Sequence, residues 1–157
     1  MSDILLRSAS EADAALLRDL ARACPPLDLH TPYTYWVNAR YFGDLAVIAE
    51  EGGLPIGFAM AVLRGQTLLL WQIGILPPAR GRGISGTLID QVERHAHQHG
   101  VTTIEVSIAP ENAASNAAVR SWARRRSLEV EHIGDVKLTD DTDPGFMEFE
   151  HIFRIRL

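Results

Sequence analysis

The chain has little cysteine, few basic residues and no long apolar run, and each shortage excludes a class of protein. Cys24 is the one cysteine among 157 residues, so no internal disulfide framework exists. Lys and Arg number 15 against 20 Asp and Glu, and the net charge of −5 argues against a nucleic-acid partner, because phosphate binding needs a basic face. No apolar run approaches the ~18 residues of a membrane span.

The sequence also offers no export signal and no clear metal site. Residues 1–17 carry acidic side chains early and lack a signal-peptide layout, which with a lone thiol predicts a cytoplasmic protein. We expect Cys24 to be a buried, small apolar residue at a helix end. His95 and His99 could share a helix face as metal ligands, but a solvated helix C-terminus explains them better, so no metal is predicted.

The apolar content is that of one globular domain over residues 1–157, since 46% of the residues are hydrophobic. Ser8 and Glu11 form a candidate capping box for a helix that ends before Pro25. Residues 27–42 mix aromatic and polar side chains and indicate a loop with a short helix. Period-2 and period-3.6 patterns predict strands at 4–7, 45–50, 56–63, 67–76, 102–108, 130–138 and 147–157, further helices at 85–99 and 113–126, and an acidic loop at 139–145.

This order of elements predicts an α+β (mixed α/β) fold with a mostly antiparallel, twisted sheet of about seven strands and about four helices. The segments 45–50, 56–63 and 67–76 are separated by short Gly-containing turns, which indicates an antiparallel meander. Pro77 and Pro78 stop its last strand. The residues just after that strand carry the strongest functional signal in the chain.

The segment Pro78-Ala79-Arg80-Gly81-Arg82-Gly83-Ile84-Ser85-Gly86 comes after a strand and opens a helix. Glycines let backbone N–H groups approach a ligand closely, and the first turn of a helix has unpaired N–H donors and a positive dipole end. A phosphate suits such a place, and two arginines add charge. A tight turn with two exposed arginines is the simpler alternative. No Gly-Lys-Ser or Gly-Lys-Thr comes after it, so a P-loop is excluded.

This loop, with a Leu/Ile-rich helix after it, resembles the acyl-CoA loop of the GNAT acetyltransferase superfamily, Arg/Gln-x-x-Gly-x-Gly/Ala, with Ser85 in place of the final Gly or Ala. The resemblance implies that backbone N–H groups of residues 82–86 bind the pyrophosphate of acetyl-CoA. It also implies that the strand 71–76 splays from its neighbour and holds the pantetheine arm. The implied cofactor-binding residues are Ile73, Ile75, Arg80, Gly81, Arg82, Gly83, Ile84, Ser85, Gly86, Asn112 and Ser115.

A narrower resemblance, over most of the chain, is to the diaminobutyrate acetyltransferases of ectoine biosynthesis. It is carried by Cys-Pro-Pro-Leu-Asp-Leu at 24–29, Tyr33, Val-Ile-Ala-Glu at 47–50, Trp-Gln at 71–72, Pro-Glu-Asn-Ala-Ala-Ser at 110–115, and Glu150 with Arg-Ile at 154–155. The chain departs from that family at His30-Thr31, at Val106-Ser107-Ile108 and at Met147, where the family has Asn-Ser, Thr-Thr-Val and His. All three departures lie at the amine end rather than at the CoA end.

The resemblance implies a substrate-binding set of Asp28, Tyr33, Trp71 and Glu150. Carboxylates pair with ammonium groups, an aromatic face attracts a cation, and a phenol can donate to a carboxylate. Core packing for the two aromatic residues and a turn role for Asp28 are the simpler alternatives. The resemblance also implies a homodimer, with the segment 27–42 contributing to its interface.

An amine must lose a proton before it attacks a thioester, and a free alkyl amine has a pKa near ~10.4. Glu105 points opposite to its apolar neighbours in a predicted strand and matches a Glu of the diaminobutyrate family, so we take it as the catalytic base. An ion pair with a neighbouring arginine is the alternative role. Backbone N–H groups near residues 73–75 would stabilise the oxyanion. Many GNAT enzymes place a tyrosine general acid where this chain has Ala123.

The sequence thus predicts an acetyl-CoA-dependent N-acetyltransferase for a small diamino acid, with 2,4-diaminobutyrate or a close analogue as the acceptor. An acyl-CoA sensor without turnover, an acetyltransferase for protein amines and one for another small amine remain alternatives. The acids at 28, 105 and 150 argue against a passive sensor. The aromatic segment 27–42, which has the character of a lid over a small pocket, argues against a protein acceptor.

Overall fold

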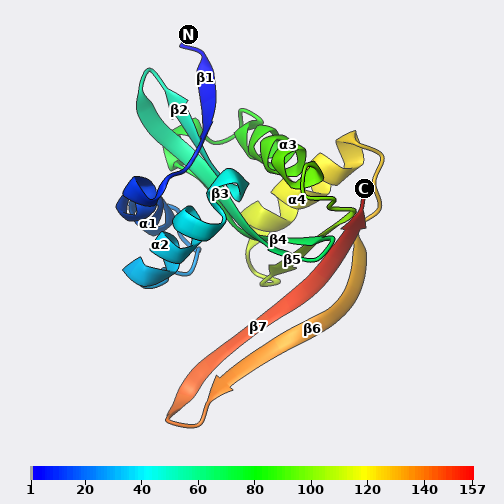
Figure 1. Cartoon of the computed structure of the whole chain (residues 1–157). Helices are drawn as coiled ribbons and strands as arrows, with labels where there is room; N and C mark the ends of the chain where they lie inside the picture. Colours follow the sequence, from blue (N-terminus) through cyan, green and yellow to red (C-terminus); the bar gives the residue numbers. More distant parts are fainter. Residues whose placement is uncertain (1) are drawn as a thin grey trace.

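A single seven-stranded sheet, in the order β1-β2-β3-β4-β5-β7-β6, organises the protein (Figure 1). The computed structural model describes residues 2–157. Its strands are β1 Ile4–Ser8, β2 Ala46–Glu51, β3 Leu54–Arg64, β4 Thr67–Ile75, β5 Thr103–Ile108, β6 Glu131–Asp140 and β7 Asp143–Arg156. Every neighbouring pair is antiparallel except β4 and β5. The predicted meander and the predicted mostly antiparallel sheet are therefore confirmed.

Within residues 2–157, four α-helices cover the two faces of this sheet, as predicted. The helices α1 Ala14–Arg22 and α2 Pro32–Tyr41 pack on one face through a cluster with Ile48, Phe58 and Met60. The helices α3 Ile84–His97 and α4 Ala113–Arg125 pack on the other face. Three short 3-10 turns, η1 Glu11–Asp13, η2 Gly43–Leu45 and η3 Pro77–Ala79, lie in the connections.

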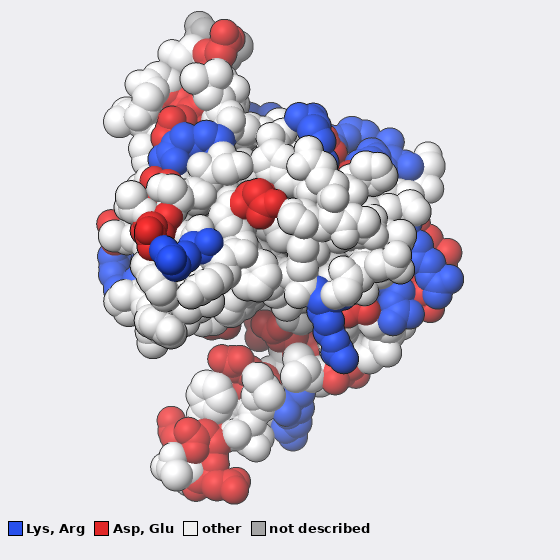
Figure 2. Space-filling view, in the orientation of Figure 1, with Lys and Arg blue, Asp and Glu red and all other residues white. Residues whose placement is uncertain are grey.

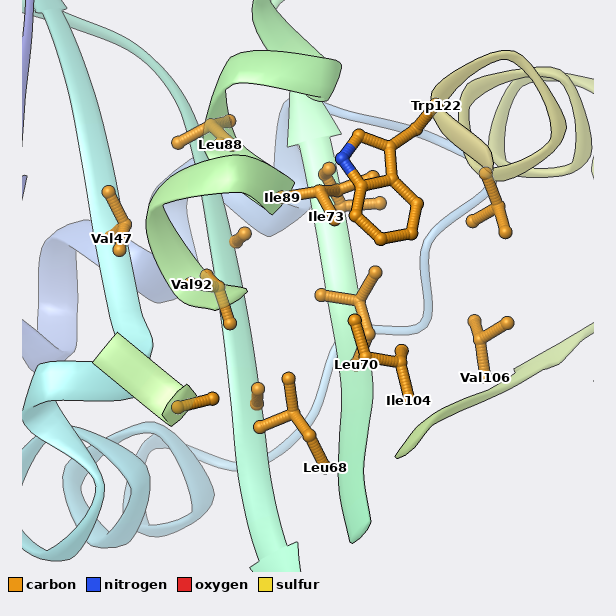
Figure 3. Packing of buried hydrophobic residues seen from close by; sticks show 14 of the residues in the cluster. Val47, Leu68, Leu70, Ile73, Leu88, Ile89, Val92, Ile104, Val106 and Trp122 are labelled. Atoms are coloured by element: carbon orange, nitrogen blue, oxygen red, sulfur yellow. The ribbon is translucent and has the colours of Figure 1, made fainter. Parts of the chain in front are cut away.

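The larger core lies between the sheet and α3 and α4. Strand residues alternate between the two faces, so Val47 belongs to this core whereas its neighbour Ile48 belongs to the other one. Figure 3 shows helix side chains directed at strand side chains in this core: Leu88, Ile89, Val92 and Trp122 against Leu68, Leu70, Ile73, Ile104 and Val106. The indole N–H of Trp122 donates to Asp90 Oδ1 at 2.7 Å, which ties α4 to α3.

The helix start near residue 10 differs from the prediction. The capping box joins Ser10 and Asp13 instead of Ser8 and Glu11. Ser8 is the last residue of β1 and pairs with Val47 in the ladder, so its backbone is already in the sheet. The N–H of Ser10 donates to Asp13 Oδ2 at 2.9 Å, and both oxygens of Asp13 also accept from Arg7 at 2.9 Å. The carboxylate therefore anchors the start of the helix to β1.

The predicted acidic loop 139–145 is wrong, because most of it lies in strands. β6 and β7 continue to Asp140 and from Asp143, and a turn of two residues joins them. Asp, Gly and Pro usually break strands, but the pairs Thr139 with Met147 and Asp140 with Asp143 carry the ladder onward. The result is a long two-stranded ribbon that projects from the body (Figure 1) and carries many acidic side chains (Figure 2).

The sheet opens between β4 and β5, and this opening positions the site. The two strands pair only over Thr67–Leu69 and Thr103–Glu105, at one end of each. The register of β3 against β4 shifts between Met60 and Ala61, which leaves Trp71 as an extra bulged residue. Beyond this point the second half of β4 has no partner on its β5 side, and the predicted splaying of this strand is confirmed.

Candidate active site

Two cavities meet in the opening between β4 and β5. The first has a volume of about 430 Å³ and the second about 570 Å³, which are sizes that suit small ligands. Five residues line both cavities: Pro26, Leu27, Ile73, Asn112 and Ser115. A group bound in one cavity can therefore reach a group bound in the other across this common wall.

The glycine-rich loop and the start of α3 form one end of the first cavity. Gly83 is the N-cap of α3 with φ of 76°, a conformation that favours glycine. The first-turn N–H groups of α3 lack helical partners and, with the helix dipole, favour an anion there. Arg80 Nε donates to the carbonyl of Ile75 at 3.0 Å, which ties the loop to β4. Nine of the predicted cofactor residues line this cavity: Ile73, Ile75, Arg80, Gly81, Gly83, Ile84, Ser85, Asn112 and Ser115.

Two residues of the predicted cofactor set, Arg82 and Gly86, do not line the cavity. Arg82 points to β2 and pairs with Glu51 at 2.7 and 3.0 Å, and this arginine holds the pKa of Glu51 below its usual range. Gly86 is buried in α3, where an added Cβ would lie 2.9 Å from Nη1 of Arg125. Within the loop, Arg80 is thus the arginine that faces the cavity.

The Cys-Pro-Pro-Leu segment forms part of the wall of the first cavity. It approaches β4 so closely that a Cβ on Gly74 would lie 3.0 Å from Cys24 Sγ and 2.9 Å from Leu27 Cδ1. Cys24 comes just after the end of α1 and is 2% exposed, so the predicted buried position is confirmed. Burial raises the pKa of its thiol. The absence of a side chain at Gly74 is what lets this segment close over the strand.

The second cavity brings together three of the four predicted substrate residues, Asp28, Trp71 and Glu150. The ring of Trp71 lies against that of His30, with centroids 5.2 Å apart. Glu150 comes from β7 and Asp28 from the segment before α2, so two separate elements supply the carboxylates of this cavity. The cavity thus combines negative charge with an aromatic surface, the pair of features that attracts an organic ammonium group.

Gln72, to which the sequence analysis gave no role, lines this cavity and fixes the positions of two neighbouring segments. Gln72 is 5% exposed, accepts a hydrogen bond from the Tyr35 hydroxyl at 2.9 Å, and donates to the carbonyl of Asp28 at 2.6 Å. Its partners lie 37 and 44 residues away in the chain, so spacing could not reveal them. The available signal was an amide side chain within an apolar strand, since buried amides are hydrogen-bonded.

Tyr33 and Glu105 line neither cavity. Tyr33 is 70% exposed and stacks on Trp36 at 5.5 Å between ring centroids. Glu105 accepts a hydrogen bond from Arg154 Nη2 at 3.3 Å, which is the arginine ion pair expected as its alternative role. It sits at the closed end of the opening, two residues before Ser107, which does line the second cavity.

Position 123, where many GNAT enzymes have a tyrosine, contributes nothing polar. Ala123 is 1% exposed and packs in the core beside Trp122. The hydroxyl side chains of α4 that line the first cavity are Ser115 and Ser121.

The comparisons with known proteins agree with this geometry. Residues 14–123 match the model of the acetyltransferase (GNAT) family. This chain belongs to that family. It is 35% identical to an L-2,4-diaminobutyric acid acetyltransferase of Streptomyces coelicolor, over 98% of this chain and 93% of the relative. It is 32% identical to the enzyme of the same name from Halomonas elongata, over 91% and 78% of the two chains.

A solved structure extends the likeness to the whole fold. It is the diaminobutyrate acetyltransferase EctA from Paenibacillus lautus, in complex with L-2,4-diaminobutyric acid and coenzyme A. The TM-score is 0.88 at 28% identity, and the match covers 99% of this chain and 96% of that one. The GNAT resemblance and the fold inferred from the sequence are therefore confirmed. Among residues 2–157, no helix has the length and apolarity needed to cross a membrane.

Proposed function

We propose that this protein transfers the acetyl group of acetyl-CoA to a primary amine of L-2,4-diaminobutyrate. The observation that carries the proposal is the meeting of two cavities in one sheet opening, with a glycine-rich helix start in the first and two carboxylates beside an indole in the second. The name of the Streptomyces relative and the ligands of the Paenibacillus structure support this choice of donor and acceptor.

Acetyl-CoA would occupy the first cavity. Its pyrophosphate fits the N-terminus of α3, where a side chain on Gly81 or Gly83 would occupy the space of the phosphate oxygens. Arg80 lines the same end and adds positive charge. The unpaired half of β4 would hold the pantetheine arm along Ile73 and Ile75, and the thioester would then reach the wall common to both cavities.

The diamino acid would occupy the second cavity. Asp28 and Glu150 would pair with its ammonium groups, and Trp71 would offer its ring face to the same charge. Gln72 would position Asp28 by holding its carbonyl at 2.6 Å. Tyr33 lies in the first turn of α2 and outside the cavity, so any contact with the substrate carboxylate requires the start of α2 to move toward the ligand.

In the reaction, the neutral amine attacks the thioester carbonyl carbon, and the negative charge that develops on oxygen is held by backbone N–H groups near residues 73–75. The intermediate collapses by breaking the C–S bond, and the thiolate takes up a proton. We assign the base role to Glu105, acting through one bridging water because its carboxylate does not line the cavity. Ala123 has no proton to give, so solvent or another group must protonate the thiolate.

The decisive experiment measures thiol release from acetyl-CoA with a panel of free amines. We expect turnover with 2,4-diaminobutyrate and close diamino acids, and little with monoamines or peptide N-termini. A different small amine is the second candidate acceptor, because His30 and Met147, which line the second cavity, differ from the family pattern. Binding of CoA without release of thiol to any amine would instead identify a sensor.

Two further aspects belong to the proposal. We infer a homodimer, because apolar side chains are exposed both on the segment 27–42, at Tyr33 and Tyr41, and on the β6–β7 ribbon, at Leu138 and Met147. A cytoplasmic location is supported by the lone Cys24 and by the use of acetyl-CoA.

A further inference from the structure

His132, Asp135 and His151, none of which lines either cavity, form a cluster at the base of the β6–β7 ribbon. Asp135 Oδ1 lies 2.7 Å from His132 Nε2 and 2.6 Å from His151 Nδ1. The two imidazole rings meet edge to face, with centroids 4.7 Å apart. Hydrogen bonds from His151 and His132 hold the pKa of Asp135 below its usual range, so the carboxylate is ionised at neutral pH.

A β-bulge brings these three side chains to one face of the ribbon. In a regular strand, residues three apart point to opposite faces, so His132 and Asp135 would separate. Here His132 pairs with Phe153, Gly134 with Ile152 and Asp135 with His151, and the shift of register leaves Ile133 as the extra residue. Bulges often serve to re-aim a side chain in this way.

We propose that His132, Asp135 and His151 bind one divalent transition-metal ion such as Zn²⁺. The three ligand atoms all lie within 4.8 Å of one another. Tetrahedral zinc with bonds of ~2.0–2.1 Å separates its ligand atoms by roughly 3.4 Å, so small side-chain rotations convert the hydrogen-bonded cluster into a metal site. Imidazole and carboxylate donors suit zinc, nickel and copper, whereas magnesium and calcium prefer oxygen ligands.

The cluster is open enough for an ion to enter and for water to complete its coordination. The exposed fractions of the side chains are 48% for His132, 44% for Asp135 and 33% for His151. Two ligands come from β6 and one from β7, so the ion would cross-link the strands where the ribbon leaves the body. His151 is next to Glu150 of the second cavity, and a bound ion would therefore restrain that wall without contacting the substrate.

The test is calorimetric titration of the EDTA-treated protein with ZnCl₂. We expect one ion per chain and a rise in the thermal unfolding temperature, because a ligand that binds only the folded state stabilises it. Affinity for zinc should fall by at least about 10- to 100-fold in each of three variants, His132→Gln, His151→Gln and Asp135→Asn. A loss of this size is usual when a residue that only orients a metal ligand is removed, so the removal of a ligand itself should cost no less. Asp135→Asn keeps the shape of the side chain and serves if a histidine variant does not fold.

His99→Gln is the matched control, because His99 also pairs with a carboxylate, its Nε2 lying 2.5 Å from Asp44 Oδ2 at the end of α3. This variant should bind zinc as the wild type does. The proposal is overturned if the wild-type protein binds no zinc at micromolar concentrations. It is equally overturned if the three cluster variants bind zinc as tightly as the wild type, whatever the result for His99→Gln. Neither result bears on acetyl transfer.

Discussion

At the scale of single residues, the two carboxylates of the second cavity carry the proposed recognition of the amine. A charge-assisted contact in a desolvated pocket contributes about 1.5–3 kcal/mol, or roughly 10- to 150-fold in binding. We expect Asp28→Asn and Glu150→Gln to raise KM for 2,4-diaminobutyrate by factors of this size with a smaller change in kcat, since the contact is present in ground and transition states alike. Steady-state kinetics at saturating acetyl-CoA would measure both constants.

Asp141→Asn is the control for that pair, because Asp141 lies exposed in the turn of the ribbon and does not line the cavity, so its substitution removes the same charge outside the site. Its KM should stay at the wild-type value. If Asp28→Asn and Glu150→Gln keep wild-type kinetics as the control does, the acidic cavity does not recognise the acceptor, and a small diamine is the wrong substrate class.

Glu105 has two candidate roles, as the catalytic base and as the ion-pair partner of Arg154. If it is the base, Glu105→Gln should lower kcat by about 10²–10⁴-fold and remove an acidic limb from the pH–rate profile. If it serves only as the partner of Arg154, Glu105→Gln and Arg154→Gln should give the same, smaller loss. Parallel pH–rate profiles of the two variants distinguish these outcomes, and a normal profile for Glu105→Gln rejects the base.

At the scale of elements, the proposed binding of acetyl-CoA requires the start of α3 to bring its backbone close to the pyrophosphate. We expect Gly83→Glu to abolish CoA binding in calorimetry while the fold persists, because the substitution adds both bulk and negative charge at the anion site. Gly100→Glu is the control: Gly100, just beyond the end of α3, has φ of 75° against 76° for Gly83, and in both cases no atom lies within 4 Å of an added Cβ. Unchanged CoA affinity in folded Gly83→Glu would refute the loop assignment.

The Arg7–Asp13 contact gives the start of α1 a pH dependence. Hydrogen bonds from Arg7, with one from the Ser10 backbone, hold the pKa of Asp13 below its usual range. The pKa of an Asp carboxyl in the unfolded chain is ~3.9, and the pKa of Asp13 in the folded protein is lower. The ionised carboxylate therefore stabilises the folded state fully at pH values above ~3.9, and this stabilisation is lost as the pH falls through the folded pKa. Arg7 is 39% exposed, so water screens the pair, and Asp13→Asn should cost up to about 1 kcal/mol of unfolding free energy at pH 7.

Urea unfolding at pH 7 and in acid would measure this difference, which should shrink toward zero in acid. Asp19→Asn provides the comparison, because the Asp19–Arg22 pair is exposed, with Asp19 at 66%, and such pairs contribute little. An equal cost for Asp13→Asn at both pH values would show that the charge of Asp13 does not matter.

The elements also show what a single sequence can reveal about this protein. Local patterns predicted seven strands, four helices and the glycine-rich loop, because each depends on neighbouring residues. The ribbon end, the Trp71 bulge and the Tyr35–Gln72–Asp28 contacts depend on pairing between distant segments, which no local pattern encodes. For the same reason Arg82 was expected among the cofactor-binding residues, yet the structure turns its side chain to Glu51.

At the scale of the whole molecule, the β6–β7 ribbon projects from the body (Figure 1) and has little of the same chain to pack against. A two-stranded hairpin like the one that projects in Figure 1 is marginally stable alone in water. This one exposes Leu138, Phe146 and Met147 at 48%, 40% and 60%. The outer edge of β6 is also the end of the sheet. A second copy of the chain that covers these side chains would stabilise the ribbon, and we therefore expect a dimer mass in light scattering at micromolar concentration.

Surface variants would then locate the interface. Leu138→Asp with Met147→Asp should give a monomer if the ribbon forms it, whereas Tyr33→Ser with Tyr41→Ser should do so if the segment 27–42 forms it. Leu54→Asp is the control, because Leu54 is 70% exposed at the distant β2–β3 turn and should leave the dimer intact. A monomer mass for the wild-type chain would reject the dimer, and the ribbon would then have to be stable without a partner.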